Sequence, residues 1–133
     1  MPHPIMFEDD DPVLARLRTI ALAFPDATEQ VAHGRPTFRC GKQFGVYGGG
    51  VKGGHNSYPA GLLFKADPAE QQALEQDPRF WVPAYYGAYG WLGLDLAVKP
   101  DWSEVVELLD ASYRQIAPKR ALARLDAGEG PTG

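Results

Sequence analysis

Six glycines occur between residues 47 and 61, and three of them have the spacing G-x-G-x-x-G: Gly48, Gly50 and Gly53. That spacing is typical of a loop that holds a dinucleotide pyrophosphate against a helix N-terminus. The motif requires a strand before the glycines and a helix directly after them. Here a proline and a strand-like run, 61–65, follow instead. The sequence therefore predicts a long, mobile connection over 48–58 between antiparallel strands, and no nucleotide pocket.

The single cysteine, Cys40, could form a thiol dyad or a metal pair with His33 or His55. No third ligand has zinc-site spacing, and a lone cysteine in a strand is typically packed in the core. The chain also lacks the G-x-S-x-G and H-E-x-x-H motifs. We therefore expect a non-enzymatic protein with no catalytic residue, no bound metal and no cofactor.

Charge is distributed unevenly along the 133 residues. No Asp or Glu occurs between Gln30 and Ala66, and this window has a formal charge of +5. Since the whole chain carries −4, the remainder carries −9. Such segregation creates a directional field that favours an anionic partner at the basic window. The basic residues of the window are Arg35, Arg39, Lys42, Lys52 and Lys65.

Nothing in the sequence indicates a membrane span or an export signal. The apolar run 20–24 is far shorter than the ~20 residues that cross a bilayer. The acidic N-terminus lacks the basic start and apolar stretch of a signal peptide. One cysteine allows no internal disulfide, which fits a reducing compartment. These features predict a cytoplasmic protein with no membrane contact.

Helices are predicted at 11–24, 67–77, 101–116 and 119–125 from apolar spacing of 3.6 residues and from capping residues. The first three begin with an aspartate N-cap: Asp11, Asp67 and Asp101. Glutamate follows the second and third caps at the capping-box position. We expect a single domain over 11–126, with a loose tail at 1–10 and a flexible tail at 127–133.

Alternating or short apolar runs predict strands at 29–32, 37–40, 43–47, 61–65, 79–87 and 90–98. Alternation places Phe44 and Val46 on one face of their strand. The pattern favours an α+β fold, a two-layer structure with an antiparallel sheet of about five or six strands backed by helices. Four apolar side chains should be buried, Phe24, Phe44, Leu94 and Leu109, and three basic ones exposed, Arg35, Lys42 and Lys52.

Three stretches in order, 34–45, 62–96 and 107–120, resemble the MmcQ/YjbR family of small bacterial proteins. The resemblance extends from about Val13 to Leu125. It implies a CyaY-like fold and DNA binding through hairpins likened to a double wing. The matching positions are Arg35, Phe38, Arg39, Lys42, Lys65, Trp91, Ser112 and Tyr113, of which the aromatic residues and Ser112 are expected to be structural. The glycine-rich segment and the acidic balance of this chain depart from the family pattern.

The leading hypothesis is weak, non-specific DNA binding through phosphates by a monomer or weak dimer. Its contact residues would be Arg35, Arg39, Lys42, Lys52 and Lys65, with Lys119, Arg120 and Arg124 contributing from the basic end. An alternative is a protein- or small-ligand-binding module that uses the aromatic cluster Phe80–Trp91. A third hypothesis, metal binding by acidic residues, rests on fold analogy alone.

Overall fold

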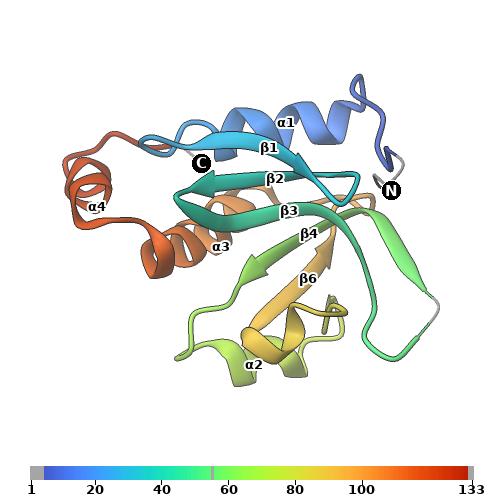
Figure 1. Cartoon of the computed structure of the whole chain (residues 1–133). Coiled ribbons are helices and arrows are strands. Elements are labelled where there is room, and N and C mark those ends of the chain that lie inside the picture. Colours follow the sequence, from blue (N-terminus) through green and yellow to red (C-terminus); the bar gives the residue numbers. More distant parts are fainter. Residues whose placement is uncertain (1–4, 55, 132–133) are drawn as a thin grey trace.

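A computed structural model of the chain describes residues 5–54 and 56–131. In this described part, six strands form one antiparallel sheet in the order β1-β2-β3-β4-β6-β5 (Figure 1). The strands are β1 (Thr28–Ala32), β2 (Arg35–Cys40), β3 (Lys42–Gly50), β4 (Ser57–Lys65), β5 (Phe80–Trp81) and β6 (Trp91–Asp95). The helices are α1 (Pro12–Ala21), α2 (Gln71–Gln76), α3 (Trp102–Ile116) and α4 (Lys119–Asp126), with a 3-10 turn at Gly87–Tyr89.

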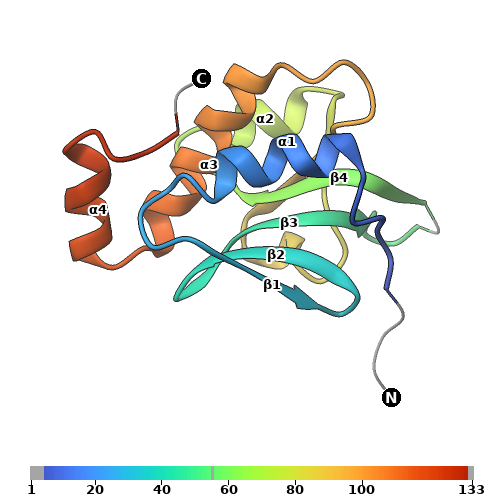
Figure 2. The ribbon, with the colours of Figure 1, turned by 90° about the horizontal axis from the view of Figure 1, so that it is seen from above.

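Helices α1 and α3 pack on one face of the sheet, so the predicted two-layer α+β fold is confirmed (Figure 2). The core between the layers includes Leu14 and Leu17 from α1 and Leu109 from α3, all fully buried. The four side chains expected in the core, Phe24, Phe44, Leu94 and Leu109, are buried. No helix in the described part is both long enough and apolar enough to cross a membrane.

Capping explains where the two core helices start. The Asp11 carboxylate accepts from the Val13 N–H at 2.9 Å, and Pro12 occupies the first turn of α1. Asp101 accepts from the Ser103 and Glu104 N–H groups at 3.0 and 3.3 Å at the start of α3. Both predicted caps are therefore confirmed, although α1 ends at residue 21 and not at residue 24.

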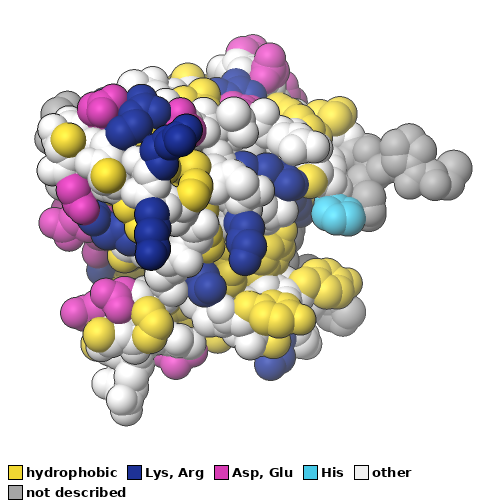
Figure 3. All heavy atoms as spheres, turned by 60° about the vertical axis from the view of Figure 1, so that its left-hand side comes forward, with side chains coloured by type: hydrophobic (Ala, Val, Ile, Leu, Met, Phe, Trp, Pro, Cys, Tyr) yellow, Lys and Arg dark blue, Asp and Glu magenta, His cyan; other side chains and the backbone are white. Residues whose placement is uncertain are grey.

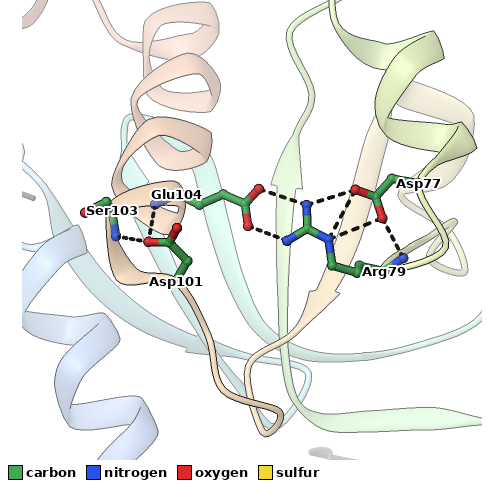
Figure 4. A network of polar contacts seen from close by, with 5 residues as sticks. All are labelled: Asp77, Arg79, Asp101, Ser103 and Glu104. Carbon is green, nitrogen blue, oxygen red and sulfur yellow. Dashed lines mark hydrogen bonds and ion pairs between the residues drawn. The ribbon is translucent and has the colours of Figure 1, made fainter.

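Glu104 does not complete a capping box, because its carboxylate accepts from Arg79. The two terminal nitrogens of Arg79 lie 2.8 and 3.0 Å from the Glu104 oxygens, and the same guanidinium also binds Asp77 (Figure 4). These contacts join the turn before β5 to the first turn of α3. The guanidinium is about half exposed, so the network orients these elements more than it stabilises them.

Helix α2 begins later than predicted. It starts at Gln71, and its N-cap Glu70 makes no side-chain capping bond. The Asp67 carboxylate instead accepts from the Ala69 N–H at 3.0 Å and so closes a turn before the helix. The prediction of Asp67 as the N-cap of α2 is wrong, because Asp and Ser side chains bond turns and helix starts with the same short-range geometry.

A β-bulge in β3 contradicts the prediction that Phe44 and Val46 lie on the same face of their strand. Phe38 pairs with Gly45 and Arg39 pairs with Gln43, so Phe44 is an extra residue between two regular pairs. Its ring enters the helix-side core, whereas Val46 packs on the opposite face with Leu63. The extra residue breaks the period-2 alternation on which the prediction relied.

The segment predicted as a strand over 79–87 is mostly irregular. Only Phe80 and Trp81 pair with β6; Pro83 forms an isolated antiparallel bridge with Val51, and residues 84–90 form turns and the 3-10 turn. Pro83 has no N–H for a ladder, and Tyr85 has a φ of +70°. The next strand, β6, ends at Asp95, whose carboxylate accepts from the Ala97 N–H. Residues 82–90 therefore do not extend β5, and they fold back over the sheet, where Tyr86 packs against the cluster of Val46, Leu63 and Trp91.

The expected tails at 1–10 and 127–133 lie partly outside the described residues. Within the described part, the Met6 N–H donates to the Gly34 carbonyl at 2.9 Å, and Asp9 forms an ion pair with Arg18. Residues 5–10 thus contact both the β1–β2 turn and α1.

Candidate nucleic-acid interface

The sheet has a second face, opposite α1 and α3, which we call the open face. Strand register places one row of residues across all six strands on this face: Gln30, Thr37, Val46, Leu63, Gly93 and Trp81. Arg35 and Arg39 lie two residues to either side of Thr37 on β2, so they share its face. Lys65 shares the face of Leu63 in the same way.

Aromatic side chains cover the β4–β6 half of the open face. The Trp81 indole lies so close over Gly93 and Gly61 that a Cβ at either position would approach it to 2.5 and 2.9 Å. Tyr58 stacks on Trp81 at 4.6 Å, and Tyr86 packs against Trp91 at 5.1 Å. Within the predicted cluster Phe80–Trp91, the rings at 80 and 91 are buried, whereas two tyrosines are largely exposed: Tyr85 at 92% and Tyr89 at 74%.

Four of the thirteen Lys and Arg residues form ion pairs with carboxylates: Arg18, Arg79, Arg114 and Arg124. The other nine form no ion pair within the described part of the chain: the five of the basic window, Arg35, Arg39, Lys42, Lys52 and Lys65, and Arg16, Lys99, Lys119 and Arg120 outside it. Figure 3, seen from the end that is at the left of Figure 1, shows Lys and Arg across the middle of the surface and acidic side chains mainly toward its margins. Within the described part of the chain, the cations of the basic window therefore have no carboxylate as an ion-pair partner.

The predicted contact residues come together only in part. Arg35, Arg39 and Lys65 lie on the open face, and Lys42 is exposed at the start of β3. The Arg39 Nε donates to the Thr37 hydroxyl at 3.0 Å, and no other described side chain forms a hydrogen bond or ion pair with its two terminal nitrogens. Lys52 is exposed in the turn between β3 and β4.

The basic end of the chain lies apart from the open face. Lys119 and Arg120 are exposed on α4, which Figures 1 and 2 place at the same end of the molecule as the β2–β3 turn. Arg124 is engaged by Asp26 at 2.7 Å and by Glu129 at 3.0 Å. The structure therefore gives no support to Arg124 as a contact residue, because its charge is already neutralised.

Arg35 is partly buried, so the prediction that it is exposed is wrong. Its Nη1 lies over Gly48, only 2.2 Å from where a Cβ on that glycine would stand. Desolvation by burial lowers the pKa of the Arg35 guanidinium below its ordinary value. No hydrogen bond or ion pair joins this guanidinium to another described residue. A partly desolvated cation with no carboxylate beside it is a feature that clusters at functional sites.

Arg35 belongs to a groove of about 630 Å³ on the open face. The groove lies between the β1–β2 turn, β3 and the folded-back 82–90 segment, and its lining includes His33, Val46, Leu63, Tyr85 and Tyr86. Gly48, Gly49 and Gly50 also line it. A Cβ at Gly49 would come within 3.0 Å of the Leu63 side chain, so this side chain packs directly on the Gly49 backbone.

The glycine-rich segment therefore differs from its prediction. Gly48–Gly50 belong to β3, and Tyr58 belongs to β4, so the connection is 51–56 and not 48–58. The next element after the glycines is strand β4 and not a helix, in agreement with the rejection of a dinucleotide fingerprint, but the glycines do line a groove. Glycine is required at these positions because Arg35 and Leu63 approach the backbone of Gly48 and Gly49 closely, and because Gly48 has a φ of +89°. The mobility of this connection stays a prediction.

The structure separates the candidate thiol dyad. Cys40 is buried at the end of β2, with its Sγ 3.7 Å from the Pro25 carbonyl, whereas His33 is exposed at the β1–β2 turn. His55, the other candidate, lies outside the described residues. Among the residues that are described, no group of three or more His, Cys, Asp and Glu side chains is placed to hold a metal ion.

Replacing Gly48 with alanine is expected to destabilise the fold by about 1–3 kcal/mol, because a Cβ there is strained at positive φ and collides with Arg35. Gly53→Ala is the matched control, since Gly53 has a φ of +73° but nothing within 4 Å of its Cβ position. Urea denaturation should show a larger loss for Gly48→Ala. Equal losses for the two variants would mean that the contacts of the added Cβ with Arg35 and with the Pro59 carbonyl oxygen contribute nothing.

The geometry defines a small α+β protein whose sheet has one face covered by helices and one face that is basic and grooved. The family model of YjbR matches residues 22–115, from the end of α1 almost to the end of α3. The chain belongs to the YjbR family. No curated protein and no solved structure matches the chain.

Proposed function

We propose that this YjbR-family chain is a cytoplasmic, non-enzymatic DNA-binding protein that contacts phosphates through the basic residues of β2, β3 and β4. One observation carries the proposal. The fold supplies carboxylate partners to four arginines elsewhere but none, among the described residues, to the cations of the window 30–66. An anionic partner would supply what these cations lack.

The arrangement on β2 suits a phosphate backbone. Arg35 and Arg39 lie on one face of an extended strand, about 13 Å apart at ~3.3 Å per residue. The guanidinium fork matches phosphate oxygens in a bidentate manner, and Lys42 adds a point charge at the end of the hairpin. Contacts of this kind fix the position of the protein and carry no sequence information.

The acidic remainder of the chain limits the affinity. With a formal charge of −9 outside the basic window, long-range repulsion opposes the local attraction. Non-specific binding of proteins to DNA has dissociation constants of ~10⁻⁴ to 10⁻⁶ M at physiological salt. We expect this chain at the weak end of that range.

A salt titration of binding to random-sequence duplex DNA tests the proposal. A surface that neutralises about four phosphates gives a slope of roughly −3.6 in a plot of log K against log salt, by the rule of about −0.9 per contact. Fluorescence anisotropy with a labelled duplex measures both the dissociation constant and its dependence on salt. Absence of binding at ~50 mM salt, to this duplex and to a single strand of the same length, would contradict the proposal.

If no binding to DNA is found, the alternative function is favoured, namely a protein- or small-ligand-binding module that uses the aromatic cluster. The observation that favours it is the exposure of the rings of Tyr85 and Tyr89. Tyrosine rings, apolar on their faces and polar at the hydroxyl, are enriched at recognition surfaces.

A further inference from the structure

The groove on the open face combines three chemical elements. Val46 and Leu63, both 2% exposed, give it an apolar floor on the sheet. The rings of Tyr85 and Tyr86 border it from the folded-back segment. The Arg35 guanidinium lies in it over the flat backbone of Gly48. A flat apolar surface, aromatic rings and one cation together suit a planar ring that carries an anionic group.

Tyr85 is held in place although its ring is exposed. Its backbone has a φ of +70°, which non-glycine residues rarely adopt. The flanking backbone is fixed, because the Ala84 N–H donates to the Gly50 carbonyl at 2.8 Å and the Lys52 N–H donates to the Val82 carbonyl at 2.9 Å. These bonds attach the 82–86 segment to the end of β3. A ring at 92% exposure on an anchored backbone offers an uncovered stacking surface.

Arg35 differs from the other basic residues of the window in that its side chain lines the groove. Arg35 is partly buried inside the groove, whereas Lys42 and Lys52 are exposed outside it. Lys42 and Lys52 can reach the phosphates of any nucleic acid. A paired base in a duplex has both faces covered by its neighbours and cannot enter a groove to stack. An unpaired base has free faces and can be splayed from its strand.

We infer that the groove binds one unpaired base, with Tyr85 against the base and Arg35 on an adjacent phosphate, so that the chain prefers single-stranded to duplex nucleic acid. This inference rests on the proposed function and deepens it by naming the form of the nucleic acid. Arg39 continues from Arg35 along the same face of β2 and takes a further phosphate of the same strand.

The test compares a labelled 12-nucleotide oligothymidine with a 12-base-pair duplex of random sequence, by anisotropy at one salt concentration. We expect the single strand to bind at least tenfold more tightly. Tyr85→Ala should weaken single-strand binding about 5- to 160-fold, the effect of removing one base–aromatic stack, and leave duplex binding unchanged. Tyr89→Ala is the matched control, because its ring is also exposed but does not line the groove, and it should change neither affinity.

The outcomes separate this inference from the proposed function. Duplex binding as tight as single-strand binding, or a Tyr85→Ala protein that binds oligothymidine like its parent, would overturn the inference and leave the proposed function standing. No binding to either nucleic acid would overturn both. Since both tyrosine rings are exposed, the two variants should fold like the parent, and circular dichroism checks this.

Discussion

Truncating Phe44 to alanine is expected to lower the free energy of unfolding by about 3–5 kcal/mol. The Phe44 ring is fully buried and contacts Phe24 at 5.5 Å and Tyr113 at 5.2 Å between ring centroids. These three rings join the loop after α1, the bulge of β3 and the last turn of α3. The cavity is hard to close because the Ser112 hydroxyl of α3 donates to the Phe44 carbonyl at 2.7 Å and so holds the helix at the bulge. The truncation therefore removes both the transfer free energy of the ring and its dispersion attraction to the neighbouring rings.

Urea denaturation measures this effect as a lower midpoint with an unchanged slope. Tyr113→Phe is the matched control, since it keeps all three rings and removes only the hydroxyl that donates to the Pro25 carbonyl at 2.6 Å. We expect this control to cost about 0.5–1.5 kcal/mol, the net contribution of one hydrogen bond, because the Cys40 thiol also donates to the Pro25 carbonyl at 3.7 Å. A Phe44→Ala protein that is destabilised less than its control would show that the ring cluster does not hold the two layers together.

Local signals predicted the starts of α1 and α3 well, although not the start of α2. Asp11 and Asp101 cap their helices through bonds to N–H groups two or three residues away, so a short sequence window contains all the information. The bulge at Phe44 could not be predicted in this way. Its position depends on how β2 pairs with β3, and alternation within one strand does not report the register of its partner.

The sequence also could not predict which cations form ion pairs and which one is partly buried in the groove. Arg124 pairs with Asp26, which is 98 residues away, so its neutralisation depends on the tertiary fold. Arg35 is partly buried because Gly48 lies opposite it and because the segment around Tyr86 folds back over the sheet. The acid-free window identified the strands that carry the unpaired cations, but not which cation lies in a groove. A run of glycines in the strand that follows an arginine-bearing strand is the one signal that could have indicated it.

The open face also shows why the glycines recur in this chain. Gly93 and Gly61 make room for the Trp81 indole, and Gly48 makes room for the Arg35 guanidinium. In each case a large flat side chain from another strand of the sheet lies directly on backbone. The sequence pattern resembled a phosphate-binding loop, whereas the physical requirement is close approach within an antiparallel sheet.

Removing two unpaired cations is expected to reduce DNA binding far more than removing two paired ones. The first double variant is Arg39→Gln with Lys42→Gln, and the matched control is Arg114→Gln with Arg124→Gln. Each variant has two fewer positive charges, so both have a formal net charge of −6, starting from −4. The long-range repulsion from DNA is then the same in the two proteins, and only the local contacts differ. Glutamine keeps much of the side-chain stem and its packing.

For the first variant we expect the salt slope on duplex DNA to flatten by about 1.8, at about 0.9 for each phosphate that the protein no longer neutralises. Affinity at ~50 mM salt should fall by about 100-fold, because the counterion effect is largest at low salt. The control should keep the parental slope, since Arg114 and Arg124 already bind Asp110, Asp126, Asp26 and Glu129. Circular dichroism must first show that the variant without the Arg39–Thr37 hydrogen bond is folded. If the two folded double variants weaken binding equally, the protein responds to DNA through its net charge alone, and the β2–β3 hairpin is not the interface.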